Sequence, residues 1–222
     1  MSYGDAFAAW RAAAPQWDAY TRHGFVQGMC DGSLPRPAFL RYLVQDCLFL
    51  IQFSRAWALA VVKAGDLDEM RACAATVHTL LDQEMSLHVQ TCAAAGIDTV
   101  AMLRTPEAIT NIAYTRYVLD AGLSGDFLDL LAALMPCVLG YGEIGLRLAH
   151  EAAPDTPYRA WIETYAGAEY QDACHKAGAL LDAALEKRLG ANPKASPRWD
   201  ELGHRFATAT RLEAAFWDLG QA

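Results

Sequence analysis

One cysteine and two isolated carboxylates are the residues of this chain best suited to chemistry. Cys137 follows Pro136 inside a long apolar stretch, residues 126–149. Asp46 and Glu213 each stand among apolar residues in other stretches with helical character. A thiol can act as a nucleophile and a carboxyl group as an acid or base. Their placement on helices predicts a catalytic pocket inside a helical bundle.

Pro136 sets Cys137 apart from an ordinary core cysteine. A proline inside a helix removes a backbone donor and bends the helix, which frees the carbonyl of Ala132 and opens space beside the thiol. A catalytic thiol needs such space and a group that favours the thiolate. The alternative is a buried cysteine beside an ordinary kink, since cysteine is among the most buried residue types.

The faces around the two carboxylates are apolar. Asp46 has Tyr42 and Phe49 among its neighbours one helical turn away, and Glu213 has Phe216 and Trp217. A buried carboxyl group must be hydrogen-bonded, paired or protonated, and burial raises its pKa toward the range useful for proton transfer. Two alternatives remain open. A buried side chain could satisfy the hydrogen bonds of Asp46, and the carboxyl group of Glu213 could reach solvent.

Tyrosines and a possible metal set complete the candidate residues. Aromatic rings with hydroxyl groups suit a flat heteroaromatic ligand, although core packing is commoner for any single tyrosine. The tyrosines considered are Tyr114, Tyr117, Tyr141 and Tyr165. Glu84 and His88 are spaced i, i+4 and could join Glu169 and His175 at a metal, but the second pair lacks the usual spacing. We expect no metal and no cofactor.

Composition narrows the possible functions. The 222 residues are 54% hydrophobic and 20% charged, with a formal net charge of −8, which indicates a globular chain and disfavours binding to nucleic acid or to anionic membranes. The strongest apolar run, residues 130–142, is too short to span a bilayer, and the N-terminal residues lack a signal-peptide pattern. Six cysteines without a CxxC motif favour a reduced, cytoplasmic protein.

The pattern predicts one all-α domain over residues 1–222. Strand signals are weak, and capping residues precede several prolines, as in Thr105-Pro106, Thr156-Pro157 and Ser196-Pro197. Seven helical stretches are expected: residues 5–23 (with a possible break at Pro15), 36–63, 66–95, 106–121, 126–151, 157–189 and 197–219. Residues 127–139 are apolar nearly all round, which indicates burial in the core or at an interface between subunits.

The order of several motifs resembles the TenA family of thiaminase II-type proteins. The motifs, in chain order, are FVQGMCDGSLPRPAFLRYLVQDCLFL, EMSLH, AYTRYVLDAGLSGDFLDLLAALMPC, YGEIG, WIETYAG and LEAAFW, and the resemblance covers residues 23–217. The resemblance implies a heme-oxygenase-like helical bundle without haem that forms a homotetramer. It also implies cleavage of the bond between a pyrimidine methylene carbon and a leaving amine, in 4-amino-5-aminomethyl-2-methylpyrimidine or in thiamin, to give hydroxymethylpyrimidine for thiamin salvage.

The resemblance also assigns roles. Cys137 matches the nucleophile, Asp46 the residue that contacts the aminopyrimidine edge, and Glu213 the proton-transfer group. Tyr114, Tyr141 and Tyr165 match pocket tyrosines, and the cysteine places the chain in the cysteine-containing branch of the family.

Two departures from that pattern stand out. Phe49 stands where other members carry a tyrosine, and the segment CVLGY, residues 137–141, stands where bulkier aromatic residues can occur. The first departure is expected to remove a hydroxyl group from the pocket. In the second, Gly140 and Leu139 are expected to widen or reshape the leaving-group side.

Three function hypotheses follow. The first is a cofactor-free hydrolase with a cysteine nucleophile. The second is a metal-dependent oxygenase on the same scaffold, and the third is a non-catalytic protein that binds a pyrimidine for regulation. The excess of acidic residues, 26 against 18 basic ones, argues against direct contact of such a regulator with DNA.

Overall fold

The computed structural model describes residues 3–220, apart from the side chain of Gln83. Every regular element in that part of the chain is helical, so the all-α prediction is confirmed; the predicted domain limits, residues 1 and 222, lie outside it. The α-helices are α1 (Asp5–Ala13), α2 (Trp17–Thr21), α3 (Gly24–Asp31), α4 (Arg36–Lys63), α5 (Leu67–Thr79), α6 (Met85–Ala94), α7 (Thr99–Arg104), α8 (Ile109–Ser124), α9 (Phe127–Glu151), α10 (Arg159–Ala166), α11 (Ala168–Leu189) and α12 (Arg198–Trp217). A π-helical turn, Leu80–Glu84, joins α5 to α6.

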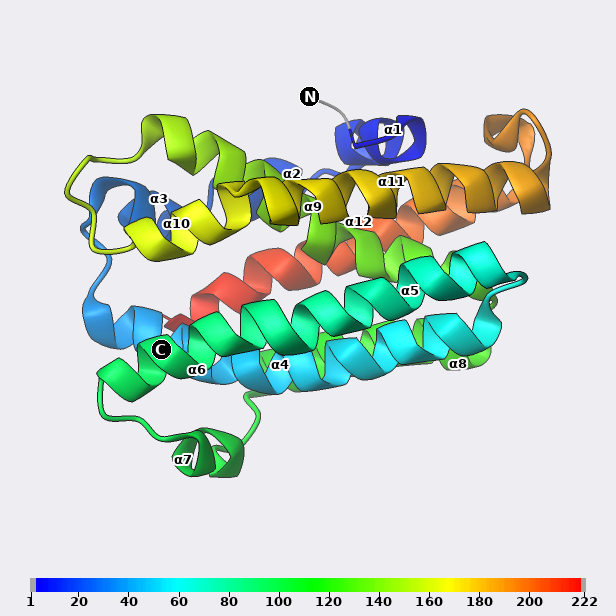
Figure 1. Ribbon diagram of the computed structural model, residues 1–222. Coiled ribbons are helices and arrows are strands. Elements are labelled where there is room, and N and C mark those ends of the chain that lie inside the picture. Colours follow the sequence, from blue (N-terminus) through cyan, green and yellow to red (C-terminus); the bar gives the residue numbers. More distant parts are fainter. Residues whose placement is uncertain (1–2, 221–222) are drawn as a thin grey trace.

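The helices form a bundle around α9 and α12 (Figure 1). Helix α12 runs through the middle of the molecule. Below it in this view, α5 and α6 follow one another end to end, and α4 lies beside both. Helices α9, α10 and α11 pack on the other side, and α7 lies apart at the edge. One continuous core of buried apolar residues extends from Tyr3 to Trp217, so side chains from both ends of the chain meet in the interior.

Several predicted boundaries need correction. The expected break at Pro15 is confirmed, and α4 matches its predicted bounds. Helices α3 and α7 are not among the helical stretches predicted from the sequence. The stretch predicted to start at Pro106 begins at Ile109, because Thr105 before the proline is extended and Gln45 holds the loop by accepting from the Ala108 amide at 2.9 Å. The predicted helix over 157–189 is divided by an extended Gly167.

Helix α9 is the most deeply buried element. A reciprocal capping box of Asp126 and Asp129 starts it, so its first backbone amides are satisfied locally. By length and composition α9 could cross a membrane, which corrects the expectation that its apolar run is too short, but 89% of its most apolar window is buried inside the protein. Because the neighbouring helices of the same chain provide this burial, the apolar pattern of α9 requires no subunit interface.

Two glycines of α9 allow close contacts that shape the interior. A Cβ at Gly140 would lie 2.3 Å from Cε1 of Tyr20, so the Tyr20 ring of α2 fills the volume that a side chain would need. A Cβ at Gly145 would lie 2.5 Å from the backbone carbon of Tyr165, so glycine permits α10 to pack directly on α9. This second contact positions Tyr165, one of the predicted site residues.

We expect Gly145→Ala to destabilise the fold by about 1–3 kcal/mol, because the added methyl group meets backbone that cannot rotate away. Thermal unfolding would measure the effect. Gly203→Ala is the matched control, since its Cβ would meet only the edge of the Trp10 ring at 3.3 Å. Equal melting temperatures for Gly145→Ala and the wild type would contradict this account of helix packing.

Candidate active site

The structure brings the predicted site residues together from five helices. Their side chains are all buried. Helix α4 supplies Asp46 and Phe49, α8 supplies Tyr114, α9 supplies Cys137 and Tyr141, α10 supplies Tyr165, and α12 supplies Glu213. Tyr117, on α8, does not join them, because its hydroxyl donates to the Arg205 carbonyl at 3.2 Å.

Cys137, Glu213 and Tyr114 form a chain of interacting polar groups. The Cys137 thiol and the Glu213 carboxyl group are close enough for each to shift the pKa of the other. The Tyr114 hydroxyl donates to Oε1 of Glu213 at 2.7 Å. Glu213 therefore does not reach solvent, and its carboxyl group is oriented from α8 while it faces the thiol on α9. This arrangement lets Glu213 take a proton from the thiol and return one.

Burial governs the ionisation of this chain. Desolvation, helped by the charge of Asp46, raises the pKa of Glu213 to about 8, although the hydrogen bond from Tyr114 and the nearby Cys137 thiol oppose the rise. Desolvation and the neighbouring charges of Glu213, Glu84 and Asp46 raise the pKa of the Cys137 thiol well above its ordinary value. The resting thiol is therefore protonated at neutral pH, and activation requires a proton acceptor beside it.

Asp46 belongs to a second hydrogen-bonded group. Its Oδ2 atom accepts from the Tyr42 hydroxyl at 2.9 Å and lies 2.7 Å from Nε2 of His88. The Tyr42 hydroxyl also lies 3.5 Å from that of Tyr141. Within the described part of the chain both contacts use Oδ2, which leaves Oδ1 for an incoming donor. Buried side chains therefore satisfy one oxygen of Asp46, so the alternative of a purely structural aspartate is correct for Oδ2 only.

Glu84 adds a third buried carboxyl group. It lies at the end of the π-helical turn, and the Tyr165 hydroxyl donates to its Oε2 at 3.2 Å. Desolvation first, and then the charge of Asp46, raises the pKa of Glu84 to about 7, although His88 and Tyr165 oppose the rise. The π-turn is a geometry often found at functional sites.

Large aromatic rings enclose these polar groups. Trp217 stacks on Tyr141 with ring centroids 5.3 Å apart, and Trp161 lies 4.4 Å from Tyr165. The sequence reasoning named neither tryptophan as a pocket residue, although Trp217 follows Glu213 by one helical turn and its spacing could have identified it. Such rings provide flat apolar faces on which a heteroaromatic ligand can stack.

The two departures from the family pattern have different outcomes. Phe49 packs against Tyr114 and Phe216, with ring centroids 5.0 and 5.3 Å apart, so it lies beside the Glu213 chain without a hydroxyl group. At Gly140 the Tyr20 ring occupies the volume of the missing side chain, so this glycine does not widen the pocket. Leu139 is fully buried in the core.

The alternative metal set is not assembled. Glu84 and His88 are buried, whereas Glu169 and His175 are exposed on α11. Both ring nitrogens of His88 already face protein oxygens, so neither is free to bind an ion. Among residues 3–220 no group of three histidine, cysteine, aspartate or glutamate side chains has the arrangement of a metal site.

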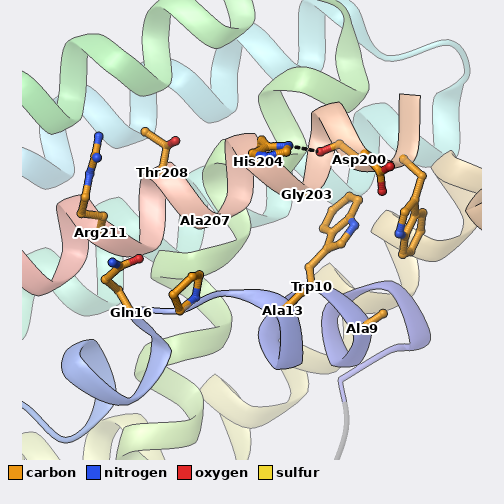
Figure 2. Close-up of a pocket in the computed structure, with 12 residues that line it drawn as sticks. Ala9, Trp10, Ala13, Gln16, Asp200, Gly203, His204, Ala207, Thr208 and Arg211 are labelled. Carbon is orange, nitrogen blue, oxygen red and sulfur yellow. Dashed lines mark hydrogen bonds between the residues drawn. The ribbon is translucent and has the colours of Figure 1, made fainter. Parts of the chain in front are cut away.

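A separate surface pocket of about 400 Å³ lies between the N-terminal segment and α12 (Figure 2). Trp10, Trp199 and His204 line it. None of the seven predicted site residues reaches it, so the candidate active site is the buried cluster and not this open pocket.

Comparison with known proteins agrees with the helical architecture. The family model described as the TENA/THI-4/PQQC family matches residues 10–221. A crystal structure from Silicibacter sp. TM1040, titled a TenA family transcription regulator, superposes with a TM-score of 0.96 at 57% identity and covers 98% of this chain and 97% of that one.

Sequence comparison also finds relatives that match nearly the whole chain. The chain is 36% identical to a protein named aminopyrimidine aminohydrolase from Halalkalibacterium halodurans, over 96% of this chain and 94% of that protein. It is 40% identical to an uncharacterized protein of Haemophilus influenzae, over 94% of each chain.

We expect Glu213→Gln to stabilise the fold progressively as the pH rises from about 4.5 to about 8. In this range the unfolded wild type loses the Glu213 proton while the folded wild type retains it. The free energy of unfolding of the wild type therefore falls by up to ~1.4 kcal/mol per pH unit, and that of Glu213→Gln does not. Denaturant unfolding at several pH values would measure the difference. Glu163→Gln, at an exposed position of α10, is the control. A difference that does not change with pH would contradict the assignment.

Proposed function

The chain belongs to the TENA/THI-4/PQQC family, and from that premise we propose that it is a hydrolase of aminopyrimidines. Its proposed substrates are 4-amino-5-aminomethyl-2-methylpyrimidine and thiamin, and its product is hydroxymethylpyrimidine for thiamin salvage. The observation that carries the proposal is the buried chain from Cys137 through Glu213 to Tyr114. The aminopyrimidine aminohydrolase named among its relatives supports the reaction class.

Asp46 and the aromatic rings bind the substrate in this proposal. The Asp46 carboxylate accepts from the exocyclic amino group and from a protonated ring nitrogen of the pyrimidine. Tyr141 and Trp217 provide flat faces for the ring. Protonation of the ring nitrogen withdraws electrons, so the ring carbon next to the methylene-bearing carbon becomes open to attack.

Covalent catalysis then proceeds in two stages. Glu213 takes the Cys137 proton, and the sulfur forms a bond to that ring carbon. The ring electrons expel the leaving group from the methylene carbon. A neutral amine takes the proton held by Glu213, whereas the thiazole of thiamin leaves as a neutral ring and that proton passes to solvent. Water adds to the exocyclic methylene group and gives up a proton to Glu213, after which the carbon–sulfur bond breaks and the Cys137 thiolate takes that proton back. The balance is one water consumed, one amine or thiazole released and one hydroxymethyl group formed.

A non-catalytic regulator is the second candidate, because a structure 57% identical to this chain is titled a transcription regulator. The formal net charge of −8 disfavours direct DNA binding. The metal-dependent oxygenase has no support from the arrangement of its expected ligands. The homotetramer and the small-molecule partner, an aminopyrimidine or thiamin, stay predictions.

We expect Cys137→Ser to lower turnover at least about 1,000-fold while the protein still folds, because a serine hydroxyl gives up its proton far less readily than a thiol. Chromatography of hydroxymethylpyrimidine formed from each proposed substrate would measure turnover. Cys174→Ser is the control, since that thiol is also buried but donates to the Val138 carbonyl at 3.3 Å. Full activity in Cys137→Ser would exclude this nucleophile, and ligand-induced stabilisation without product would favour the regulator.

We expect kcat/KM of the wild type to rise with pH up to about 8, because only ionised Glu213 accepts the thiol proton. Tyr114→Phe removes a hydrogen bond that lowers the pKa of Glu213. The rising limb of kcat/KM against pH should therefore lie at higher pH in this variant than in the wild type. Tyr117→Phe, on the same helix but bonded to the Arg205 carbonyl, is the matched control. A Tyr114→Phe profile that superimposes on that of the wild type would refute this role for Glu213.

A further inference from the structure

His88 is fully buried, and each of its ring nitrogens faces an oxygen atom. Nδ1 lies 2.5 Å from the backbone carbonyl of Glu84, and Nε2 lies 2.7 Å from Oδ2 of Asp46. The proposed mechanism does not use His88. Its position between the π-helical turn and the proposed ligand-binding carboxylate nevertheless gives it a defined function.

The carbonyl contact fixes where one proton lies. A carbonyl oxygen can only accept, so Nδ1 must carry a hydrogen. A second proton then lies on Nε2, which makes His88 an imidazolium, or on Asp46. Tyr42 already donates to the same Oδ2 atom, and two donors converging on one oxygen favour a carboxylate there. The geometry thus favours a charged His88 paired with a charged Asp46.

The surroundings of the pair support this assignment. Burial alone would lower the pKa of His88, but the hydrogen bond to Asp46, the charge of Asp46 and the contacts of Glu84 raise it above its ordinary value. The other titratable groups that face the pair are Tyr42 and Cys47 of α4, Glu84 of the π-helical turn, Cys137 and Tyr141 of α9, Tyr165 of α10 and Glu213 of α12. None of these neighbours is cationic, so His88 supplies the positive charge of the cluster.

We propose that His88 is a positioning residue that holds Asp46 as an oriented carboxylate for a protonated aminopyrimidine. The inference rests on the proposed function, because it concerns how that site activates its ligand. Without the imidazolium, Asp46 would be a buried charge with no countercharge beside two other carboxyl groups. The site would then lose the fixed carboxylate that holds a proton on the ring nitrogen, although it could still bind a neutral aminopyrimidine. The step that should suffer is therefore ring activation, more than binding.

The chain contains a matched control for this histidine. Nδ1 of His204 also faces a backbone carbonyl four residues earlier, that of Asp200, at 2.8 Å. Figure 2 shows this contact on α12 at the surface pocket, whose lining residues include none of the buried cluster. His204 is exposed, so it shares the local helical geometry of His88 but not its burial or its Asp46 partner.

The kinetic test compares His88→Gln with His204→Gln. Glutamine retains an N–H donor but cannot carry a charge. We expect His88→Gln to lower kcat about 100-fold while KM changes less than about tenfold, and to alter the pH dependence of kcat. We expect His204→Gln to behave as the wild type. The proposal would be overturned if His88→Gln kept the pH profile of the wild type and lost kcat/KM only through a higher KM. A purely structural role for His88 predicts that result, because it involves no change in ionisation.

A spectroscopic test does not depend on turnover. Histidine labelled with nitrogen-15 in the wild-type protein reports whether both ring nitrogens carry protons. We expect one buried histidine to remain an imidazolium at pH 7, above the ordinary pKa of histidine at about 6.5. Its signal would be identified by its absence in His88→Gln or, if that variant does not fold, by its slow proton exchange. A neutral His88 at pH 7 would overturn the proposal. A wild type that turns over neither substrate would instead refute the proposed function, whatever the charge of His88.

Discussion

The rest of the structure depends on keeping three carboxyl groups and a thiol inside a helical core. Each of these groups would destabilise the interior if it were left charged and without hydrogen bonds. The protein meets this constraint with donors from four helices: Tyr114 for Glu213, Tyr165 for Glu84, and Tyr42 and His88 for Asp46. The helices must therefore stay at fixed distances, because a displaced donor leaves a buried carboxyl group unsatisfied.

Packing around α9 supplies this precision. Gly140 and Gly145 let Tyr20 and the backbone of Tyr165 approach the helix more closely than any other residue would allow. The hydroxyl group of Tyr20 also donates to the carbonyl of Pro136, at 3.4 Å, directly before Cys137. The backbone beside the thiol is thus fixed by a side chain from α2, so the site is built from both ends of the chain and cannot form before the bundle closes.

Residue type and local spacing were enough to select Cys137, Asp46 and Glu213, because an isolated polar group on an apolar helix face is unusual wherever the helix packs. The same local signals predicted the bounds of α4. They could not show that His88 pairs with Asp46 across 42 residues, or that Tyr20 fills the space at Gly140, because both contacts depend on how distant helices are placed. Periodicity also missed α3 and α7, which are too short for a clear repeat.

The charge balance of the cluster indicates what a ligand must bring to it. Asp46 is matched by the His88 imidazolium, whereas Glu84 and Glu213 have only neutral donors and pKa values raised to about 7 and about 8. At neutral pH these two groups lie near the point at which they exchange protons with their surroundings. A ligand that carries a positive charge, as a protonated aminomethyl group or a thiazolium ring does, would favour their ionised forms. Binding such a ligand would therefore convert Glu213 into the base that Cys137 needs, so that recognition of the leaving group and activation of the nucleophile become one event.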